Sequence, residues 1–286
     1  MYNVNLTLTS AILYMKQTFR NLSLILIVPL TYVVLHFMFR SRPSIEPGVI
    51  SHRGAAGLAP ENTRVAIQAG IDHEADFIEV DVQRSADGVL ILMHDQTVNR
   101  TTNGQGAVGN LTWDEISKLD AGSHFDKEYA GETVPILDSI MEMIEGSTST
   151  LVIEVKKPHL YPGIEEQIAE SIQHYEAQNQ VIIVSFDHEW LRKFNTLMPN
   201  VTIGLLSIYP ITIPNIAKSQ SIDVYWTSVI LDPTLIYRLH SQGHQVWVWT
   251  IDNSYMIRLL MWLGVDGITT NRPDLLHNIL NKIPSY

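Results

Sequence analysis

The sequence predicts an α/β protein folded as a (β/α)8 barrel, and three observations lead to that prediction. After Pro47, short runs of β-branched and aromatic residues alternate with amphipathic stretches, which is typical of parallel βαβ units. Of nine such runs, one follows its neighbour after a turn too short for a helix, so it returns antiparallel and eight strands remain. Residues 47–286 number 240, close to the roughly 250 residues of a typical barrel. A doubly wound open sheet is the alternative.

The elements follow in chain order. The nine predicted strands are Val49–Arg53, Phe77–Val82, Val89–Met93, Leu151–Val155, Val181–Phe186, Thr202–Leu206, Asp223–Trp226, Val246–Thr250 and Gly267–Thr270. The helices expected between them include Glu61–Ala69, Gly163–Ala177, His188–Leu197, Pro233–His240 and Ser254–Leu263.

A β-hairpin is predicted around Asp87-Gly88, a dipeptide that favours tight turns. A two-residue turn there pairs Ala86 with Val89. The same register then puts His94 directly opposite Asp81.

The connection from His94 to Leu151 is too long for one crossover. It contains a Gly-rich polar loop, a helix at Thr112–Leu119 opened by a Thr-x-x-Glu capping box, and a second helix around Ile136–Ile144. We expect a small helical excursion over the barrel mouth, since long loops in compact domains are usually functional.

The N-terminal segment differs in charge from the rest. Residues 1–46 carry a net charge of +3, from Lys16, Arg20, Arg40 and Arg42 against Glu46, whereas residues 47–286 carry −14. The 19 uncharged, mostly apolar residues 21–39 nearly match the hydrocarbon core of about 30 Å as a helix.

The prediction is therefore a single-pass membrane anchor and linker at residues 1–46 and a catalytic domain at 47–286. A cleaved signal peptide and a buried soluble helix are the alternatives. The basic residues balance on the two sides of the segment, so the side of the membrane that holds the domain is undetermined.

Composition excludes several classes. A net charge of −11 argues against a nucleic-acid partner, which needs a basic surface. The absence of cysteine excludes disulfides, thiol nucleophiles and iron–sulfur clusters. Neither a G-x-S-x-G elbow nor a phosphate-binding P-loop is present. Protein partners are unknown at this point.

Three carboxylates stand in apolar strands. Glu79 and Asp81 alternate on one face of a strand, and Glu154 lies in another strand with Lys156 two residues later. Carboxylates crowded on inward faces repel unless a cation joins them, and a hard divalent ion, Ca²⁺ or Mg²⁺, suits oxygen ligands. A strand ion-paired through Lys156 is the alternative.

Two histidines end predicted strands beside these carboxylates, His52 and His94. Arg53 and Lys156 supply the cations that bind phosphate oxygens. Two imidazoles provide a general acid and a general base near neutral pH. The combination indicates phosphodiester cleavage.

These residues lie in motifs that resemble the glycerophosphodiester phosphodiesterase family over roughly residues 49–275. The motifs are His52-Arg53-Gly54, Pro60-Glu61-Asn62-Thr63, residues 75–82, Asp87-Gly88, His94-Asp95, residues 100–104, Val134-Pro135-Ile136-Leu137, Glu154-Val155-Lys156 and residues 267–273. At position 271 this sequence has Asn where relatives often have Asp. We expect this difference to affect only a contact at the periphery of the site.

The resemblance implies a (β/α)8 barrel whose site lies at the carboxyl ends of the strands. It implies Glu79, Asp81 and Glu154 as metal ligands. The acid/base pair is then His52 and His94. Phosphate contacts are Arg53 and Lys156, Glu61 supports the site, and Trp249 forms an apolar wall beside the glycerol or else belongs to the barrel core.

The activity implied is metal-dependent hydrolysis of glycerophosphodiesters to an alcohol and sn-glycerol 3-phosphate. A lysophospholipase D that takes single-chain lipids from the bilayer is one alternative. A non-catalytic, membrane-tethered headgroup-binding protein is the other.

Overall fold

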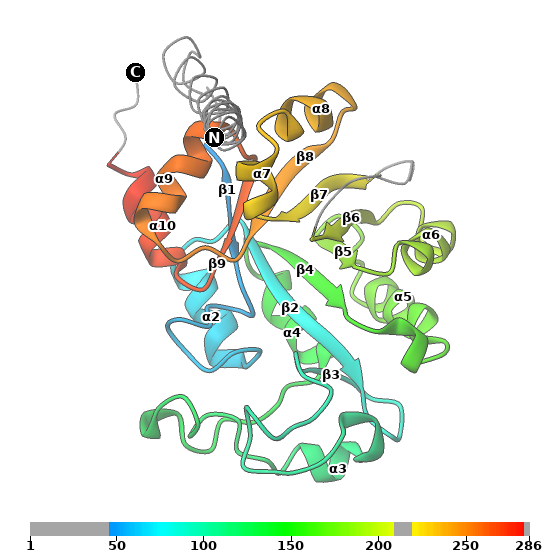
Figure 1. Cartoon of the computed structure of the whole chain (residues 1–286). Coiled ribbons are helices and arrows are strands. Elements are labelled where there is room, and N and C mark those ends of the chain that lie inside the picture. Colours follow the sequence, from blue (N-terminus) through cyan, green and yellow to red (C-terminus); the bar gives the residue numbers. More distant parts are fainter. Residues whose placement is uncertain (1–45, 209–218, 283–286) are drawn as a thin grey trace, which may run out of the picture. The chain divides into compact units, whose positions relative to one another are not determined.

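The computed structural model describes residues 46–208 and 219–282, and within them a closed barrel of eight parallel strands confirms the predicted fold (Figure 1). The strands are β1 (Gly48–Ser51), β2 (Phe77–Arg84), β3 (Leu90–Leu92), β4 (Thr150–Val155), β5 (Val181–Ser185), β6 (Thr202–Ser207), β7 (Ser219–Tyr225), β8 (Gln245–Trp249) and β9 (Gly267–Thr270). The first strand pairs with both β2 and β9, which closes the sheet and excludes the open alternative.

Helices cover the outside of the barrel (Figure 1). They are α2 (Arg64–Asp72), α4 (Leu137–Glu145), α5 (Ile164–His174), α6 (His188–Leu197), α7 (Thr227–Leu231), α8 (Leu235–Ser241), α9 (Ser254–Leu263) and α10 (Pro273–Leu280). A further short helix, α3 (Trp113–Ile116), lies in the connection between β3 and β4, away from the barrel. Short 3₁₀ turns occupy Val108–Asn110, Lys127–Tyr129 and Pro158–Leu160. The predicted bounds of α6 and α9 agree with the structure, whereas α7 and α10 had no predicted counterpart.

The predicted hairpin is present, but its predicted register is wrong by one residue. Val82 pairs with Leu92 and Gln83 with Ile91, so Met93, and not His94, lies opposite Asp81. The reason is a three-residue turn in which Gly88 has φ of +93°, a left-handed conformation that favours glycine. His94 therefore lies beyond the paired strand, where the chain bends away.

The excursion between β3 and β4 lies beside the mouth at the carboxyl end of β2 (Figure 1). Its apolar residues, together with Ile91 of β3, form a second, smaller core, which includes Val98, Val108 and Ile116. The predicted capping box is confirmed, because Thr112 and Glu115 exchange hydrogen bonds at the start of α3. None of residues 96–149, all of which the structure describes, lines the central cavity, and the excursion as a cover over the mouth stays a prediction.

The barrel interior below the site is filled by apolar side chains. The buried residues of this cluster are Ile50, Val152, Ile182, Val184, Leu206 and Trp247. Trp247 also packs on Phe77, with ring centroids 4.7 Å apart. This layer forms a rigid floor for the polar groups above it.

The predicted anchor at residues 21–39 lies outside the described residues, so the division at residue 46 stays a prediction. In the described part of the chain, we find no helix with both the length and the apolar character needed to cross a bilayer.

Candidate active site

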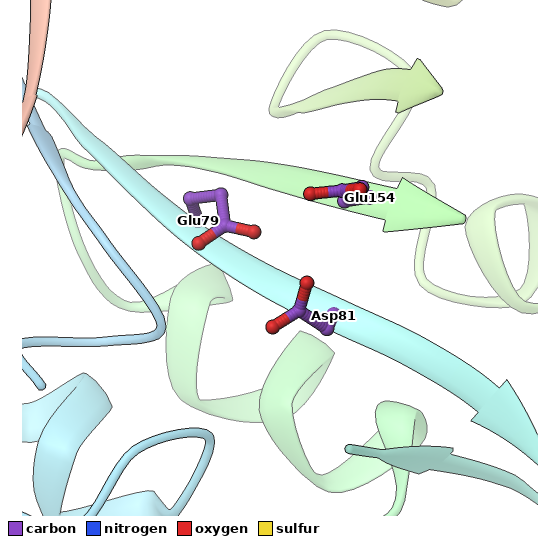
Figure 2. Close-up of side chains that lie close together, drawn as sticks. All are labelled: Glu79, Asp81 and Glu154. Atoms are coloured by element: carbon purple, nitrogen blue, oxygen red, sulfur yellow. The ribbon is translucent and has the colours of Figure 1, made fainter. Parts of the chain in front are cut away.

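Three carboxylates converge from the neighbouring strands β2 and β4. Figure 2 shows Glu79 and Asp81 projecting from β2 toward Glu154 on β4. Their ligand atoms all lie within 4.8 Å of one another, and all three residues are buried. Asp81 and Glu154 are directly paired in register, so two like charges face each other across neighbouring strands.

Lys156 compensates part of this charge. Its Nζ lies 2.7 Å from Oε1 of Glu154 and 3.0 Å from Oδ1 of Asp81. The predicted alternative to a metal site, an ion pair through Lys156, is thus present for Glu154 and Asp81. Among the described contacts, Lys156 forms no such ion pair with Glu79. Oε1 of Glu79 is buried and has no hydrogen-bond partner among the described residues.

The three carboxyl groups differ in pKa. Burial alone would raise the pKa of Asp81, but the charges of Lys156 and Arg53 outweigh burial and lower that pKa to about 2. Burial raises the pKa of Glu154 to about 7. Burial, together with the charges of Asp81 and Glu154, raises the pKa of Glu79 well above its ordinary value. The nearby cations therefore stabilise one carboxylate, and the site favours further positive charge.

These observations fit a divalent cation. The donor set is all oxygen, as Ca²⁺ and Mg²⁺ prefer. A buried, unpaired carboxylate oxygen is costly, and a bound cation would remove that cost. Glu79, Asp81 and Glu154 are the residues that would hold it.

Arg53 joins the carboxylates to the first βα loop. Its backbone has φ of +52°, which directs its N–H to Oε2 of Glu79 at 2.7 Å. Its guanidinium donates to Glu61 at 2.9 Å and lies 3.4 Å from Oδ2 of Asp81. The predicted strand Val49–Arg53 therefore ends early, at Ser51, because Arg53 adopts this turn conformation.

Asn62 is a site residue whose role the sequence did not reveal. Its Nδ2 donates to Oδ2 of Asp81 at 2.8 Å, and its Oδ1 accepts from the backbone N–H of Asp81 at 3.0 Å. Both hydrogen bonds are buried, so Asn62 fixes the orientation of the Asp81 carboxylate. Its place in the Pro-Glu-Asn motif was the only signal available.

His52 follows β1, and its ring is held from behind. Nδ1 lies 2.7 Å from Oδ1 of Asn271, and Nδ2 of Asn271 donates to Asp252 at 2.6 Å. Because the Asp252 carboxylate only accepts, the amide oxygen of Asn271 faces His52, and Nδ1 of His52 carries the proton. Nε2 then faces Glu79 at 4.0 Å as an acceptor. Burial and the charge of Arg53 lower the pKa of His52 to about 4.

His94 has a charged partner instead. Its Nδ1 donates to Oδ1 of Asp95 at 2.6 Å. Burial lowers the pKa of His94 below its ordinary value, while the charges of Asp81 and Asp95 oppose that shift. Arg100 holds Asp95 at 2.7 Å and also donates two hydrogen bonds to Glu61, each 2.8 Å long. A continuous network therefore runs from His94 to Arg53.

A cavity of about 140 Å³ brings most of the predicted residues together. Its lining includes His52, Arg53, Glu79, His94, Glu154, Lys156 and Trp249. Trp249 packs on Phe186 and Tyr225 at centroid distances of 5.8 and 5.2 Å. Glu61 lies outside this lining, in contact with Arg53 and Arg100, which agrees with a supporting position.

Comparisons with known proteins agree with this geometry. The glycerophosphoryl diester phosphodiesterase family matches residues 52–275. A glycerophosphodiester phosphodiesterase of Caldanaerobacter subterraneus subsp. tengcongensis is 38% identical over 239 residues, which cover 82% of this chain and 98% of the relative. A crystal structure of a glycerophosphodiester phosphodiesterase from Agrobacterium tumefaciens superposes with a TM-score of 0.72 at 31% identity, covering 81% of this chain and 99% of that one.

A second solved structure carries a ligand. A phosphodiesterase of Oleispira antarctica in complex with the product sn-glycerol-3-phosphate superposes with a TM-score of 0.76 at 25% identity, covering 83% of this chain and 98% of that one. The family match extends over most of the chain and includes every residue of the site described above. The chain therefore belongs to the glycerophosphoryl diester phosphodiesterase family.

Proposed function

We propose that this enzyme hydrolyses glycerophosphodiesters to an alcohol and sn-glycerol 3-phosphate, with a divalent cation and two histidines as acid and base. One observation carries the proposal: two imidazoles, each held at Nδ1, line the same cavity as Glu79, Glu154, Arg53 and Lys156. The product in the Oleispira relative is the one that this reaction releases.

The partners of the two rings support different roles. His52 has a neutral amide partner and a lowered pKa of about 4, so its Nε2 is free to accept a proton at neutral pH. His94 donates to a carboxylate, which stabilises its imidazolium form. We assign His52 as the base and His94 as the acid of the first step.

The nucleophile in this proposal is the hydroxyl of the glycerol carbon next to the phosphate ester. A vicinal hydroxyl held in line with phosphorus has a high effective molarity. His52 takes its proton as the new O–P bond forms, and His94 protonates the leaving alcohol as the old P–O bond breaks. Water then opens the cyclic glycerol phosphate with the two histidines in reversed roles.

Arg53 and Lys156 stabilise the charge on the phosphate oxygens during both steps. Bound at Glu79, Asp81 and Glu154, a divalent cation would polarise one of these oxygens as a Lewis acid.

The test is a substrate panel with the full chain. Glycerophosphocholine, glycerophosphoinositol and lysophosphatidylcholine are each assayed with Ca²⁺, Mg²⁺ or chelator, and released sn-glycerol 3-phosphate or lysophosphatidate is measured. We expect cation-dependent release of sn-glycerol 3-phosphate. Undiminished turnover after exhaustive chelation excludes the metal, and turnover of lysophosphatidylcholine alone favours the lysophospholipase D alternative.

We also propose that residues 21–39 anchor the enzyme in a membrane, on the strength of their length and lack of charge. The full chain should sediment with membranes and resist alkaline extraction, whereas residues 47–286 alone should remain in the supernatant with full activity. An uncleaved full chain in the soluble fraction would exclude the anchor.

A further inference from the structure

Asp223 is a buried carboxyl group that the reaction described above does not use. It lies on β7 between Leu206 of β6 and Trp247 of β8, two members of the apolar interior layer. The residue is 5% exposed, and it lines the same cavity as the histidines. Among the described residues of that lining, it is the only carboxylate outside the predicted metal ligands.

The described residues compensate the burial of this group only weakly, through the hydroxyl of Ser221. Oδ1 of Asp223 is buried and has no hydrogen-bond partner, and no described cationic side chain forms an ion pair with it. Burial raises its pKa to about 7. A buried polar atom without a partner is unfavourable in the ligand-free fold, so such an atom inside a cavity indicates a ligand that pairs with it.

Gly204 keeps space for the group. A Cβ at this position would lie 2.7 Å from Oγ of Ser221, 3.0 Å from Cγ1 of Val184 and 3.5 Å from Oδ2 of Asp223. A side chain there would displace Ser221 and Val184. Gly204 therefore lets β6 pack closely against the residues that surround Asp223.

The position of β7 decides which arm of the substrate reaches Asp223. The fourth strand from β2 in either direction around the barrel is β7, so it lies diametrically opposite β2. His94, which protonates the leaving alcohol, follows the hairpin strand paired with β2. Attacking and leaving oxygens lie on opposite sides of phosphorus in an in-line displacement. The leaving alcohol therefore faces His94, and the attacking glycerol hydroxyl faces His52, which follows β1 beside β2. The terminal hydroxyl, one carbon beyond the attacking one, then extends across the cavity toward the wall that carries Asp223.

The size of the cavity agrees with this orientation. It holds about 140 Å³, and a cavity of roughly 150 Å³ accommodates one benzene-sized molecule. A glycerol moiety fits such a volume. The wall around Asp223 is apolar, with Leu206, Trp247 and Trp249, so this carboxyl is the polar group that a hydroxyl there meets.

We propose that Asp223 is a specificity-determining residue that pairs with the terminal hydroxyl of the glycerol moiety, and so selects free glycerol over its deoxy and acylated forms. The proposal rests on the proposed function. A carboxyl accepts from the hydroxyl when ionised and also donates to it when protonated. Acylation of the terminal oxygen removes the hydroxyl proton and adds bulk, so a lysophospholipid loses this contact.

The test compares two substrates that both keep the vicinal hydroxyl: glycerophosphocholine and its analogue with propane-1,2-diol in place of glycerol. With the full chain, we expect kcat/KM to favour glycerophosphocholine by about 10- to 100-fold, the range of a hydrogen bond to a charged group. Asp223→Leu should abolish this preference by lowering turnover of glycerophosphocholine alone. Asp223→Asn retains an acceptor and should retain most of the preference.

The controls separate this role from others. Asp232 is an exposed aspartate after α7, and Asp232→Asn should leave kcat/KM unchanged for both substrates. Glycerophosphoinositol, whose headgroup has no cation, should respond to Asp223→Leu as glycerophosphocholine does. If only substrates with cationic headgroups respond, Asp223 recognises the alcohol arm and the proposal is wrong.

Two further outcomes overturn the inference and are distinguishable. In the first, the wild type cleaves both substrates without preferring the one with the terminal hydroxyl, or the preference persists in Asp223→Leu. Either result excludes the proposed role of Asp223 and leaves the proposed function intact. Failure of the wild type to cleave either substrate removes the proposed function and the inference with it. A variant that is merely less stable would not give the expected result, because a structural defect lowers kcat/KM for both substrates equally.

Discussion

Nδ1 of His52 and Oδ1 of Asn271 lie 2.7 Å apart, and Asn271 is itself held by Asp252 through its amide and its backbone N–H. The residue at position 271 therefore contacts the proposed base directly, and the expectation of a peripheral contact is wrong. A neutral amide behind His52 fixes the tautomer and stabilises the charged ring less than a carboxylate would.

Asn271→Asp should shift the acidic limb of the kcat/KM profile to higher pH. A carboxylate at Nδ1 stabilises the imidazolium and raises the pKa of His52 by about 1 to 3 units, so the neutral base forms only at higher pH. The variant also sets two carboxylates side by side, so its Tm should fall. Adding Asp252→Asn should restore the Tm but keep the displaced limb. An unchanged limb in both variants would show that His52 is not the base.

Asp95→Asn should shift the alkaline limb of the pH–rate profile to lower pH. The Asp95 carboxylate opposes the lowering of the His94 pKa, so its loss lets the protonated acid disappear about 1 to 2 units earlier. We expect kcat at pH 8 to fall by roughly 10- to 100-fold, within the usual contribution of a positioned acid. Asp114→Asn, which removes an exposed ion pair with Lys118 in the same excursion, is the matched control.

The increase in Tm on adding a cation should grow with pH. Glu79 and Glu154 have raised pKa values in the fold, about 7 for Glu154, so their contribution to stability is present below pH 4.5 and is lost as the pH rises through the folded value. A cation compensates that loss. With saturating Ca²⁺ or Mg²⁺ we expect a shift of about 5 to 10 °C at pH 8 and much less at pH 5. Equal shifts at both pH values would argue against binding at these carboxylates.

Glu79→Gln should separate stability from catalysis. It removes a buried charge without a cationic partner but keeps an acceptor for the Arg53 N–H, so the chelated protein should be as stable as wild type or more stable at pH 8. The Tm increase with cation should disappear, and kcat should fall on the order of 10³-fold. Glu170→Gln on the exposed side of α5 should leave all three measurements unchanged.

Two substitutions at Asn62 should rank in a fixed order. Asn62→Gly removes both hydrogen bonds to Asp81 and should cost about 1 to 3 kcal/mol of unfolding free energy. Asn62→Ala removes the same bonds and must also adopt φ near +56°, so it should cost about 1 kcal/mol more. Urea denaturation of both variants measures the difference. Equal or reversed stabilities would mean that backbone strain at Asn62 is not significant.

The barrel was predicted from the alternation of apolar strands with amphipathic helices, and the carboxylate cluster from the cost of burial. Charged residues such as Glu79 and Glu154 stand out inside apolar strands, because unpaired burial is costly. Asp223 is also a charged residue inside an apolar strand. The predicted strand began at Asp223, however, so the residue was placed at the strand end, where a charged side chain is not unusual. The strand in fact begins at Ser219, which places Asp223 in its interior.

The partners of the site were harder to predict. Asn62, Asp95, Arg100 and Asn271 lie in loops, where polar residues are common and carry no anomaly. The hairpin register failed because Asp-Gly signals a turn without specifying two residues or three. Only the three-dimensional pairing reveals which loop residues face the cavity.

The small core of the excursion has a consequence for how the enzyme can change. His94 and Asp95 lie where the chain enters this unit, and Arg100 within it ties them to Glu61 at the barrel. The proposed acid His94 therefore lies beside an apolar cluster separate from the one that surrounds the proposed cation ligands. Exchange of residues 96–136 between relatives would then be a modular substitution: it would change the surface near the proposed acid while the barrel floor stayed as it was.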